Sequence, residues 1–112
     1  MSDFTKAIEL LDTEKSDIQE QAMSLAKKMY KQTPVIYVAN GFEGVAVRFR
    51  QQINENSKML CWHHVVPEMN HNELVGWGGG DERFAPVFFT TPDLHPRNSK
   101  RFQISLAAIQ KK

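Results

Sequence analysis

Two side chains in the middle of the chain have the types needed for proton transfer near neutral pH. Glu55 lies in the segment Asn-Glu-Asn-Ser-Lys (54–58), and His71 lies in the polar segment 67–73. A carboxylate can act as a base toward a carbon-bound proton, and an imidazole can carry protons near pH 7. An apolar run separates the two segments, so their spacing alone does not establish contact. We treat Glu55 and His71 as the candidate catalytic residues.

Each of these residues also has an ordinary structural interpretation. Glu55 precedes Lys58 by three positions, a spacing at which surface carboxylates commonly pair with lysines on a helix. His71 alone is typical of a helix-cap or surface histidine. Glu68 and Glu73 are interpreted as structural carboxylates at turns and helix starts. Proton chemistry is therefore favoured only when the surrounding motifs are considered.

The turn at 40–44 is the candidate phosphate site. It lies between a predicted strand and a predicted helix, where main-chain amides can hold an anion. Gly41 and Gly44 more commonly serve backbone geometry, and the turn lacks the Gly-Lys-Ser/Thr ending of a Walker loop. Arg48, on the helix that follows, is a further candidate, although an ion pair on an exposed face is its commoner role. Gly41, Gly44 and Arg48 are the candidate substrate-binding residues.

The cysteine and histidine residues, which are common metal ligands, do not form a recognisable metal site. Cys61, His63, His64 and His71 match no zinc spacing, and adjacent histidines rarely share one ion. We therefore predict no metal, and we expect Cys61 to be a buried small hydrophobe.

Composition narrows the function classes. The 112 residues include 14 basic and 13 acidic side chains, which give a net charge of +1 and argue against a dedicated nucleic-acid binder. No apolar run approaches the roughly 20 residues of a membrane helix. The start of the chain lacks a basic region followed by an apolar run, so nothing signals secretion. We expect one cytoplasmic domain, 1–112, without nucleic-acid or membrane partners.

Helices are predicted at both ends of the chain. Phe4, Ala7, Ile8 and Leu11 recur at helical spacing after a Ser2 or Asp3 cap. Ser16 and Gln19 form a capping-box pattern for a second helix, which Thr33-Pro34 should end. Its apolar stripe is expected to face the core. The members of this stripe are Ile18, Ala22, Leu25, Ala26 and Met29. Asn98 or Ser99 is expected to cap the last helix.

Two buried strands are predicted between the helices. Val35–Ala39 is a continuous β-branched and aromatic run, typical of a central parallel strand, and Ala85–Thr91 is the second, with Pro86 near its start. Val65 and Val66 are a candidate short strand.

A helix over 45–53 is expected to break around Glu55, because Asn54 and Asn56 are poor helix residues. Helix should then resume through 62 and carry Met59, Leu60 and Trp62 inward. Asn70 is the predicted cap of a following helical turn.

This alternation of helices and strands predicts an α/β fold with parallel strands and right-handed crossovers. A sheet of two or three strands leaves unpaired main-chain hydrogen-bonding groups along its exposed edge strands. The domain therefore either pairs through an edge strand or is part of a larger sheet.

Two motifs in this order resemble the carboxyl-terminal domain of bifunctional phosphoglucose/phosphomannose isomerases, proteins built from two sugar-isomerase (SIS) domains. They are the segment 54–58, preceded by Val-Ala-Val-Arg-Phe-Arg-Gln-Gln-Ile (45–53), and Pro-Glu-Met-Asn-His-Asn-Glu-Leu-Val-Gly-Trp (67–77). The family usually has Glu-Asn-Ala-Lys, so Ser57 is a conservative departure, and Met69 replaces another apolar residue. The resemblance runs from near Ser16 to the final helix.

The resemblance implies a partial SIS-type, flavodoxin-like three-layer sandwich, with an incomplete parallel sheet flanked by helices. It implies interconversion of glucose 6-phosphate and mannose 6-phosphate with fructose 6-phosphate through a cis-enediol, without a cofactor. Glu55 would match the proton-transferring carboxylate. His71 would match the ring-opening histidine, which acts in the partner subunit's site of a homodimer.

Family members also carry an amino-terminal SIS domain with phosphate-binding loops, and a later lysine that Lys111 and Lys112 precede. We therefore expect this chain to be inactive alone. The alternative is a non-catalytic sugar-phosphate-binding or dimerisation SIS module, and the preference between glucose and mannose phosphates stays open.

Overall fold

The computed structural model describes residues 1–111 and divides into two compact units, residues 1–30 and the chain from Lys31 onward. The first unit holds helices α1 (Asp3–Thr13) and α2 (Lys15–Lys28). Ser2 caps α1 as predicted, since its hydroxyl accepts a hydrogen bond from the Thr5 amide at 3.2 Å. The expectation of a single domain stays a prediction.

The predictions for α2 are wrong in two respects. The helix begins at Lys15, so Ser16 lies inside it, and Glu14 precedes it without a side-chain capping bond. The apolar stripe expected to face the core is also not buried: Leu25 and Met29 are half-buried, and neither α1 nor α2 contains a buried residue. Two short helices have no sheet of their own against which to bury these side chains.

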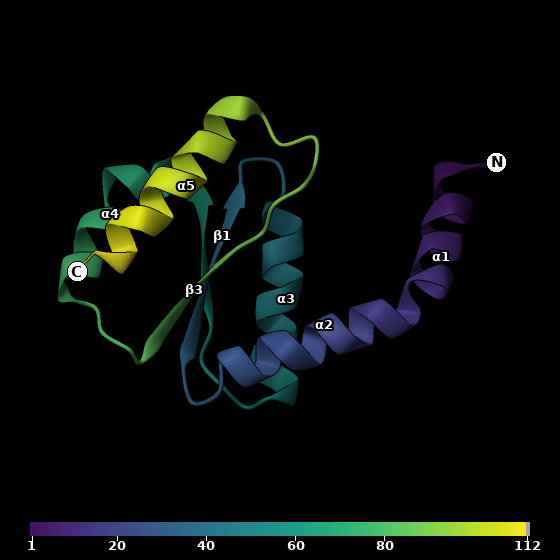
Figure 1. Cartoon of the computed structure of the whole chain (residues 1–112), viewed down its shortest axis with the longest axis horizontal. Coiled ribbons are helices and arrows are strands. Elements are labelled where there is room, and N and C mark those ends of the chain that lie inside the picture. Colours follow the sequence, from purple (N-terminus) through teal and green to yellow (C-terminus); the bar gives the residue numbers. More distant parts are fainter. Residues whose placement is uncertain (112) are drawn as a thin grey trace. The chain divides into compact units, whose positions relative to one another are not determined.

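The second unit is built on a three-stranded parallel sheet. Its strands are β1 (Thr33–Ala39), β2 (Trp62–Val66) and β3 (Phe84–Phe88), in the spatial order β2-β1-β3 (Figure 1). β1 is central, and its residues from 34 to 39 are all buried. This confirms the prediction of a buried central strand in a parallel sheet.

Helices cover both faces of this sheet, as the three-layer prediction requires. α3 (Glu43–Asn56) lies on one face, and α4 (Glu73–Gly76) and α5 (Pro96–Gln110) lie on the other (Figure 1). Two 3₁₀ turns, η1 (Glu68–His71) and η2 (Trp77–Gly79), flank α4. α5 begins earlier than predicted: its cap is His95, whose Nδ1 accepts from the Arg97 amide at 3.2 Å, and not Asn98 or Ser99.

Alternate residues of β1 contribute to two separate apolar cores, because successive side chains of a strand point to opposite faces. Ile36 and Val38 pack with Ala46 and Cys61 on the α3 face. The second core lies on the α4 and α5 face; its buried members are Val35, Tyr37, Ala39, Val66, Met69, Trp77, Phe102 and Ile109. Burial raises the pKa of the Cys61 thiol, and nearby Arg50 partly offsets that rise. Cys61 is therefore a buried small side chain, as predicted.

The connection from α3 to β2 differs from the prediction. The helix continues through Glu55 to Asn56 without a break, and the chain then leaves the helix at Lys58, which adopts a left-handed backbone with φ of 55°. The predicted inward positions are wrong for two residues, since Leu60 is 67% exposed and Trp62 is 48% exposed. Cys61 occupies the inward position between them, because strand alternation replaces the expected helical periodicity.

β3 forms one edge of the sheet and is shorter than predicted. Thr33 donates its amide to the Arg83 carbonyl, and Phe89 donates to the Tyr37 carbonyl. Since hydrogen bonding alternates along a parallel ladder, the odd-numbered residues of β3 face β1, and Pro86 faces the outer edge. Pro86 therefore lies in mid-strand without interrupting the ladder to β1.

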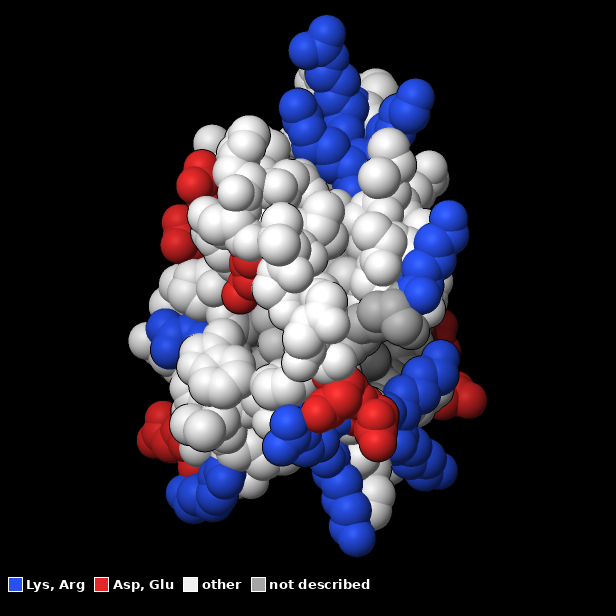
Figure 2. Space-filling model, turned by 90° about the vertical axis from the view of Figure 1, so that its left-hand side faces the viewer, with Lys and Arg blue, Asp and Glu red and all other residues white. Residues whose placement is uncertain are grey.

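The surface over α5 separates charged from uncharged side chains. Figure 2 shows a group of Lys and Arg at the upper end of this face, over the first turns of α5, where Arg97, Lys100 and Arg101 are exposed. Uncharged side chains cover much of the area below them. None of the helices that the structure describes has the length and apolar character needed to cross a membrane.

Candidate active site

Glu55 lies on the last turn of α3, where its side chain is exposed to solvent. α3 starts beside the carboxyl end of β1 and runs back to the segment that enters β2, so Glu55 lies near the amino ends of the strands. Lys58, the predicted ion-pair partner, donates a hydrogen bond from its ammonium to the main-chain carbonyl of Glu55. The lysine thereby closes the end of the helix and brings a positive charge close to Glu55.

A shallow hollow of about 450 Å³ is lined by residues from the last turns of α3 and from the segment that leads into β2. Two cationic residues, Arg50 and Lys58, line it together with Asn54. The Asn54 amide donates to the Met59 carbonyl at 2.8 Å, which fixes the loop leaving α3. The apolar cover expected over Glu55 is weaker than predicted, because Leu60 is exposed and Met59 is only half-buried. Glu55 itself does not line the hollow, and Lys58 is the cation that the structure places beside it.

A hydrogen-bonded chain of three side chains joins α3 to β2. The Arg50 Nε donates to Nδ1 of His63 at 3.0 Å, and His63 Nε2 lies 3.2 Å from a carboxylate oxygen of Glu43. With Nδ1 as acceptor, we assign the ring proton to Nε2, which then donates to Glu43. Sequence reasoning missed this arrangement. It depends on the pairing of β2 with β1, which the two apolar residues of the predicted short strand did not reveal.

The glycine turn has the geometry expected for glycine and an unfavourable charge for an anion. Gly41 has φ of 98°, a left-handed conformation that side chains rarely adopt. The first turn of α3 then begins with Glu43, and a carboxylate at this position opposes a phosphate electrostatically. Arg48 is exposed on α3, and its guanidinium lies beside the Gln52 amide. Phosphate binding by Gly41, Gly44 or Arg48 stays a prediction.

His71 ends the 3₁₀ turn η1, which follows β2, and its side chain is exposed. Two neighbours anchor the turn to the core: Met69 is fully buried, and the Asn70 amide donates to the buried Ser105 hydroxyl of α5 at 2.7 Å. The predicted cap, Asn70, is two residues too early. Asn72 caps α4, accepting from the Glu73 amide at 2.6 Å, while the Asn70 side chain bonds to α5 instead.

Glu55 and His71 therefore lie at opposite ends of the sheet. Glu55 precedes β2, and His71 follows it. The five residues of β2 alone separate the two levels by about 13 Å at the usual strand rise. This geometry does not bring the two candidate catalytic residues into one site within a single chain. In the described residues, no group of three or more His, Cys, Asp or Glu side chains is placed to hold a metal ion.

The family model and the two relatives described next are all phosphoglucose isomerases by name. Residues 18–112 match the family model described as the bacterial phospho-glucose isomerase C-terminal SIS domain. A bifunctional phosphoglucose/phosphomannose isomerase of Aquifex aeolicus is 34% identical over 89 residues, which cover 80% of this chain and 28% of that protein. The protein of that name from Caldicellulosiruptor bescii is 33% identical over 109 residues, 91% of this chain and 32% of the relative.

A more distant similarity is to a protein named D-glucosamine-6-phosphate 4-epimerase from Sulfolobus acidocaldarius. It is 33% identical over 57 residues, covering 51% of this chain and 18% of that protein. The chain spans about a third or less of the relatives it matches. No solved structure matched the chain.

Proposed function

The chain belongs to the family of C-terminal SIS domains of bacterial phosphoglucose isomerases, and we propose that it supplies part of the active site of an aldose-ketose isomerase. The substrates would be glucose 6-phosphate and mannose 6-phosphate, interconverted with fructose 6-phosphate through a cis-enediol. The observation that carries the proposal is the match across residues 18–112, which includes both Glu55 and His71.

We assign Glu55 as the base that moves a proton between C2 and C1 of the sugar. A carboxylate performs this step when it lies within reach of the carbon-bound proton and is shielded from water by substrate and protein. The exposure of Glu55 in this chain agrees with a site that is completed by another part of the protein. The cationic Arg50 and Lys58 around the adjoining hollow favour an anionic sugar phosphate nearby.

We assign His71 to ring opening in a second active site, that of the partner subunit in a homodimer. Its position at the carboxyl end of β2, far from Glu55, supports this division of roles. Its exposure leaves the imidazole accessible to another chain, while the bond from Asn70 to Ser105 ties the turn to α5. An amino-terminal SIS domain, as the family carries, would bind the phosphate.

Subunit complementation tests both assignments. A chimera is made in which residues 18–112 replace the matching segment of the Aquifex aeolicus relative. Glu55→Gln and His71→Gln chimeras should each lose about 10²-fold or more in kcat, the usual contribution of a positioned acid or base. Unfolding and reassociating the two inactive variants together should restore about a quarter of the parent activity, because half of the dimers are mixed and each mixed dimer has one intact site.

This experiment has two controls. Glu20→Gln, an exposed carboxylate on α2, should leave turnover unchanged. The 112-residue chain alone should show no turnover, because it matches only the C-terminal SIS domain of the family. Parent-like kcat in the Glu55→Gln chimera would refute the assignment of the base, and failure of mixed variants to recover activity would place both residues in one subunit's site.

The alternative is a non-catalytic sugar-phosphate-binding or dimerisation module. The observation that favours it is the exposure of Glu55, which has little apolar cover within this chain because Leu60 is exposed as well. Titration of the chain with fructose 6-phosphate, followed by amide chemical shifts, distinguishes the two functions when combined with the chimera. Binding by the chain together with an inactive but folded chimera would favour the module.

A further inference from the structure

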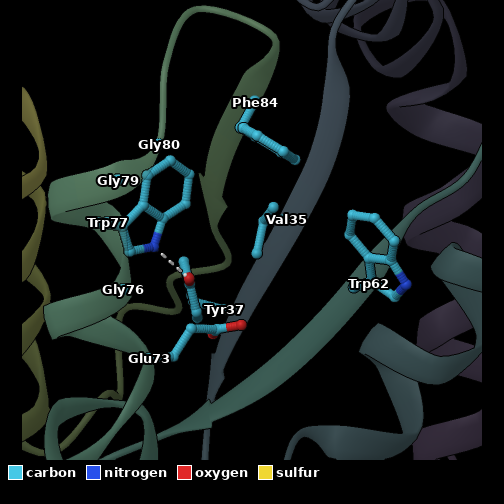
Figure 3. A pocket seen from close by; sticks show the side chains of 9 residues that line it. All are labelled: Val35, Tyr37, Trp62, Glu73, Gly76, Trp77, Gly79, Gly80 and Phe84. Atoms are coloured by element: carbon cyan, nitrogen blue, oxygen red, sulfur yellow. Dashed lines mark hydrogen bonds between the residues drawn. The ribbon is translucent and has the colours of Figure 1, made fainter.

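A cavity of about 380 Å³ opens on the face of the sheet that carries α4. Four aromatic side chains contribute to its wall: Tyr37 of β1, Trp62 of β2, Phe84 of β3, and Trp77, which follows α4 (Figure 3). The rings of Trp77 and Phe84 meet edge to face, with centroids 6.3 Å apart. Glycines on the α4 side leave the space open, since a Cβ added at Gly76 or Gly79 would meet no atom within 4 Å.

The carboxylate of Glu73 lies among the aromatic side chains of the cavity wall. Glu73 is the only charged residue among the described residues that line the cavity, and it lies beside the Tyr37 hydroxyl (Figure 3). Its Oε2 is buried and has no hydrogen-bond partner in the part of the chain that the structure describes. The sequence predicts Glu73 to be a structural carboxylate at a helix start. Glu73 is indeed the first residue of α4, but its bond to Asn72 comes from the main-chain amide, and the carboxylate points into the cavity.

The neighbouring polar groups do not balance the charge of Glu73. The Tyr37 hydroxyl accepts a hydrogen bond from the indole Nε1 of Trp77 at 2.6 Å and in turn interacts with the Glu73 carboxylate, but both the hydroxyl and the indole are neutral, and Oε2 of Glu73 is left without a partner in the described residues. No lysine, arginine or histidine lines the cavity among the described residues. A carboxylate oxygen removed from water without a donor is unfavourable, so a ligand that brings an N–H donor and a positive charge would be stabilised there.

We propose that this cavity binds an organic cation, an alkylammonium or guanidinium group attached to an apolar body. Glu73 would accept the hydrogen bond and balance the charge, and the faces of Trp62, Trp77 and Tyr37 would surround the apolar body and the cation, since aromatic rings attract cations. The cavity has the size of an ordinary small-molecule site, which starts at roughly 300 Å³. Neither Glu55 nor His71 lines it, so the proposal does not depend on the isomerase assignment.

An organic cation of this kind can come from two sources: a free amine, or a lysine or arginine side chain of another protein segment. Both would place a cationic group against Glu73. They differ in what surrounds the cation, because a side chain carries flanking main-chain amides into the mouth of the cavity. The two sources are therefore distinguished by probes that either include or lack those amides.

Tryptophan fluorescence of the intact chain reports on this cavity directly, because both of its tryptophans, Trp62 and Trp77, line the cavity. Benzylammonium is titrated against benzyl alcohol, a neutral molecule of nearly the same shape. We expect a saturable change with benzylammonium that Glu73→Gln weakens at least tenfold. Benzyl alcohol should bind the parent chain and Glu73→Gln equally weakly, since only the cation uses the carboxylate.

Two further variants make the result interpretable. Glu20→Gln removes the same charge from an exposed position on α2 and should leave benzylammonium binding unchanged. Trp62→Leu removes an aromatic wall whose side chain is half exposed, so the fold should persist, and it should weaken benzylammonium more than benzyl alcohol. Far-ultraviolet circular dichroism checks that each variant is folded.

N-acetyl-arginine amide and N-acetyl-lysine amide form the second arm of the experiment. Tighter binding of either than of benzylammonium would identify a protein side chain as the occupant, and the reverse order would identify a free amine. Absence of a saturable response to every cation would overturn the proposal. Equal benzylammonium affinity in the parent and in folded Glu73→Gln would overturn it as well.

Discussion

At the scale of single residues, Tyr37 is the most deeply buried titratable side chain of the sheet. Its ring is fully buried in the centre of β1, and its hydroxyl lies between the indole of Trp77 and the carboxylate of Glu73. Burial is the largest cause that raises the pKa of this hydroxyl far above its ordinary value of 10.0, and the charge of Glu73 adds to the rise. The folded protein therefore holds Tyr37 in its neutral form.

Folding stability should consequently fall in alkaline solution. The unfolded chain releases the Tyr37 proton above about pH 10 and the folded chain retains it, so the stability present below this pH is lost as the pH rises. One such proton changes the free energy of unfolding by about 1.4 kcal/mol per pH unit. Urea unfolding between pH 8 and 11 should show a steeper decline for the parent chain than for Tyr37→Phe.

Tyr30→Phe is the matched control, because Tyr30 is the other of the two tyrosines in the sequence and is 72% exposed. Its stability should follow the parent curve at every pH, including the contribution from lysine titration that all variants share. An equal alkaline slope for Tyr37→Phe and the parent would show that the unfolded and folded chains ionise Tyr37 alike.

At the scale of elements, α5 begins with a charge arrangement that opposes its own dipole. The first turn contains Arg97 and no acidic residue, although the amino end of a helix carries partial positive charge. Ring Nδ1 of His95 caps the turn, and Pro96 provides a backbone angle suited to the first helical position. These local features start the helix in spite of the unfavourable cation.

Arg97→Glu should therefore stabilise the protein. Replacing an exposed cation by an anion near the helix start should add about 0.5 to 1 kcal/mol to the free energy of unfolding at low salt. Arg97→Gln, which removes the charge without reversing it, should give a smaller gain. Thermal unfolding at low salt and at 1 M salt measures both, and the gain should shrink in high salt because screening weakens the interaction. A gain that is independent of salt would point to a cause other than charge.

The elements also show what the sequence can predict. The sequence predicts β1 from its continuous apolar run and α1, α3 and α5 from apolar residues at helical spacing, because both patterns are visible in the order of residue types alone. β2 was predicted only in part, since exposed Trp62 and the adjacent histidines do not form an apolar run. The cap of α5 was missed because histidine is not among the common caps.

For the candidate site, the sequence motifs named Glu55 and His71, and the structure adds where they lie. Their placement at opposite ends of β2 follows from the order of elements, and their roles in different subunits stay a prediction. The cavity around Glu73 was not predictable, because its aromatic wall comes from three strands and the segment after α4. Such a wall depends on strand register, which short apolar runs leave unspecified.

At the scale of the whole molecule, the two compact units differ in how much side-chain surface they bury. The sheet unit has two apolar cores, whereas α1 and α2 contain no buried residue. Helical hydrogen bonds that lack buried apolar support open at low free-energy cost. The amino-terminal helices should therefore be the least stable part of the chain.

Hydrogen exchange followed by mass spectrometry tests this difference. Amides of α1 and α2 should exchange at least about tenfold faster than those of β1, whose residues from 34 to 39 are buried. The ratio should persist when the chain is diluted, as expected for a property of the single molecule. Protection of α1 equal to that of β1 would show that the helices are held by contacts stronger than their exposure suggests.

Pro86 has a consequence for how the protein behaves at high concentration. It faces the outer edge of β3, where a hydrogen-bond donor would otherwise be offered to any extended chain. Cross-β stacks grow only when each added strand finds an unbroken row of donors and acceptors. A proline in the middle of this row leaves a gap that slows the growth of fibrils from the edge of a folded molecule. The same residue that fits without loss into the native sheet thus limits polymerisation of the chain.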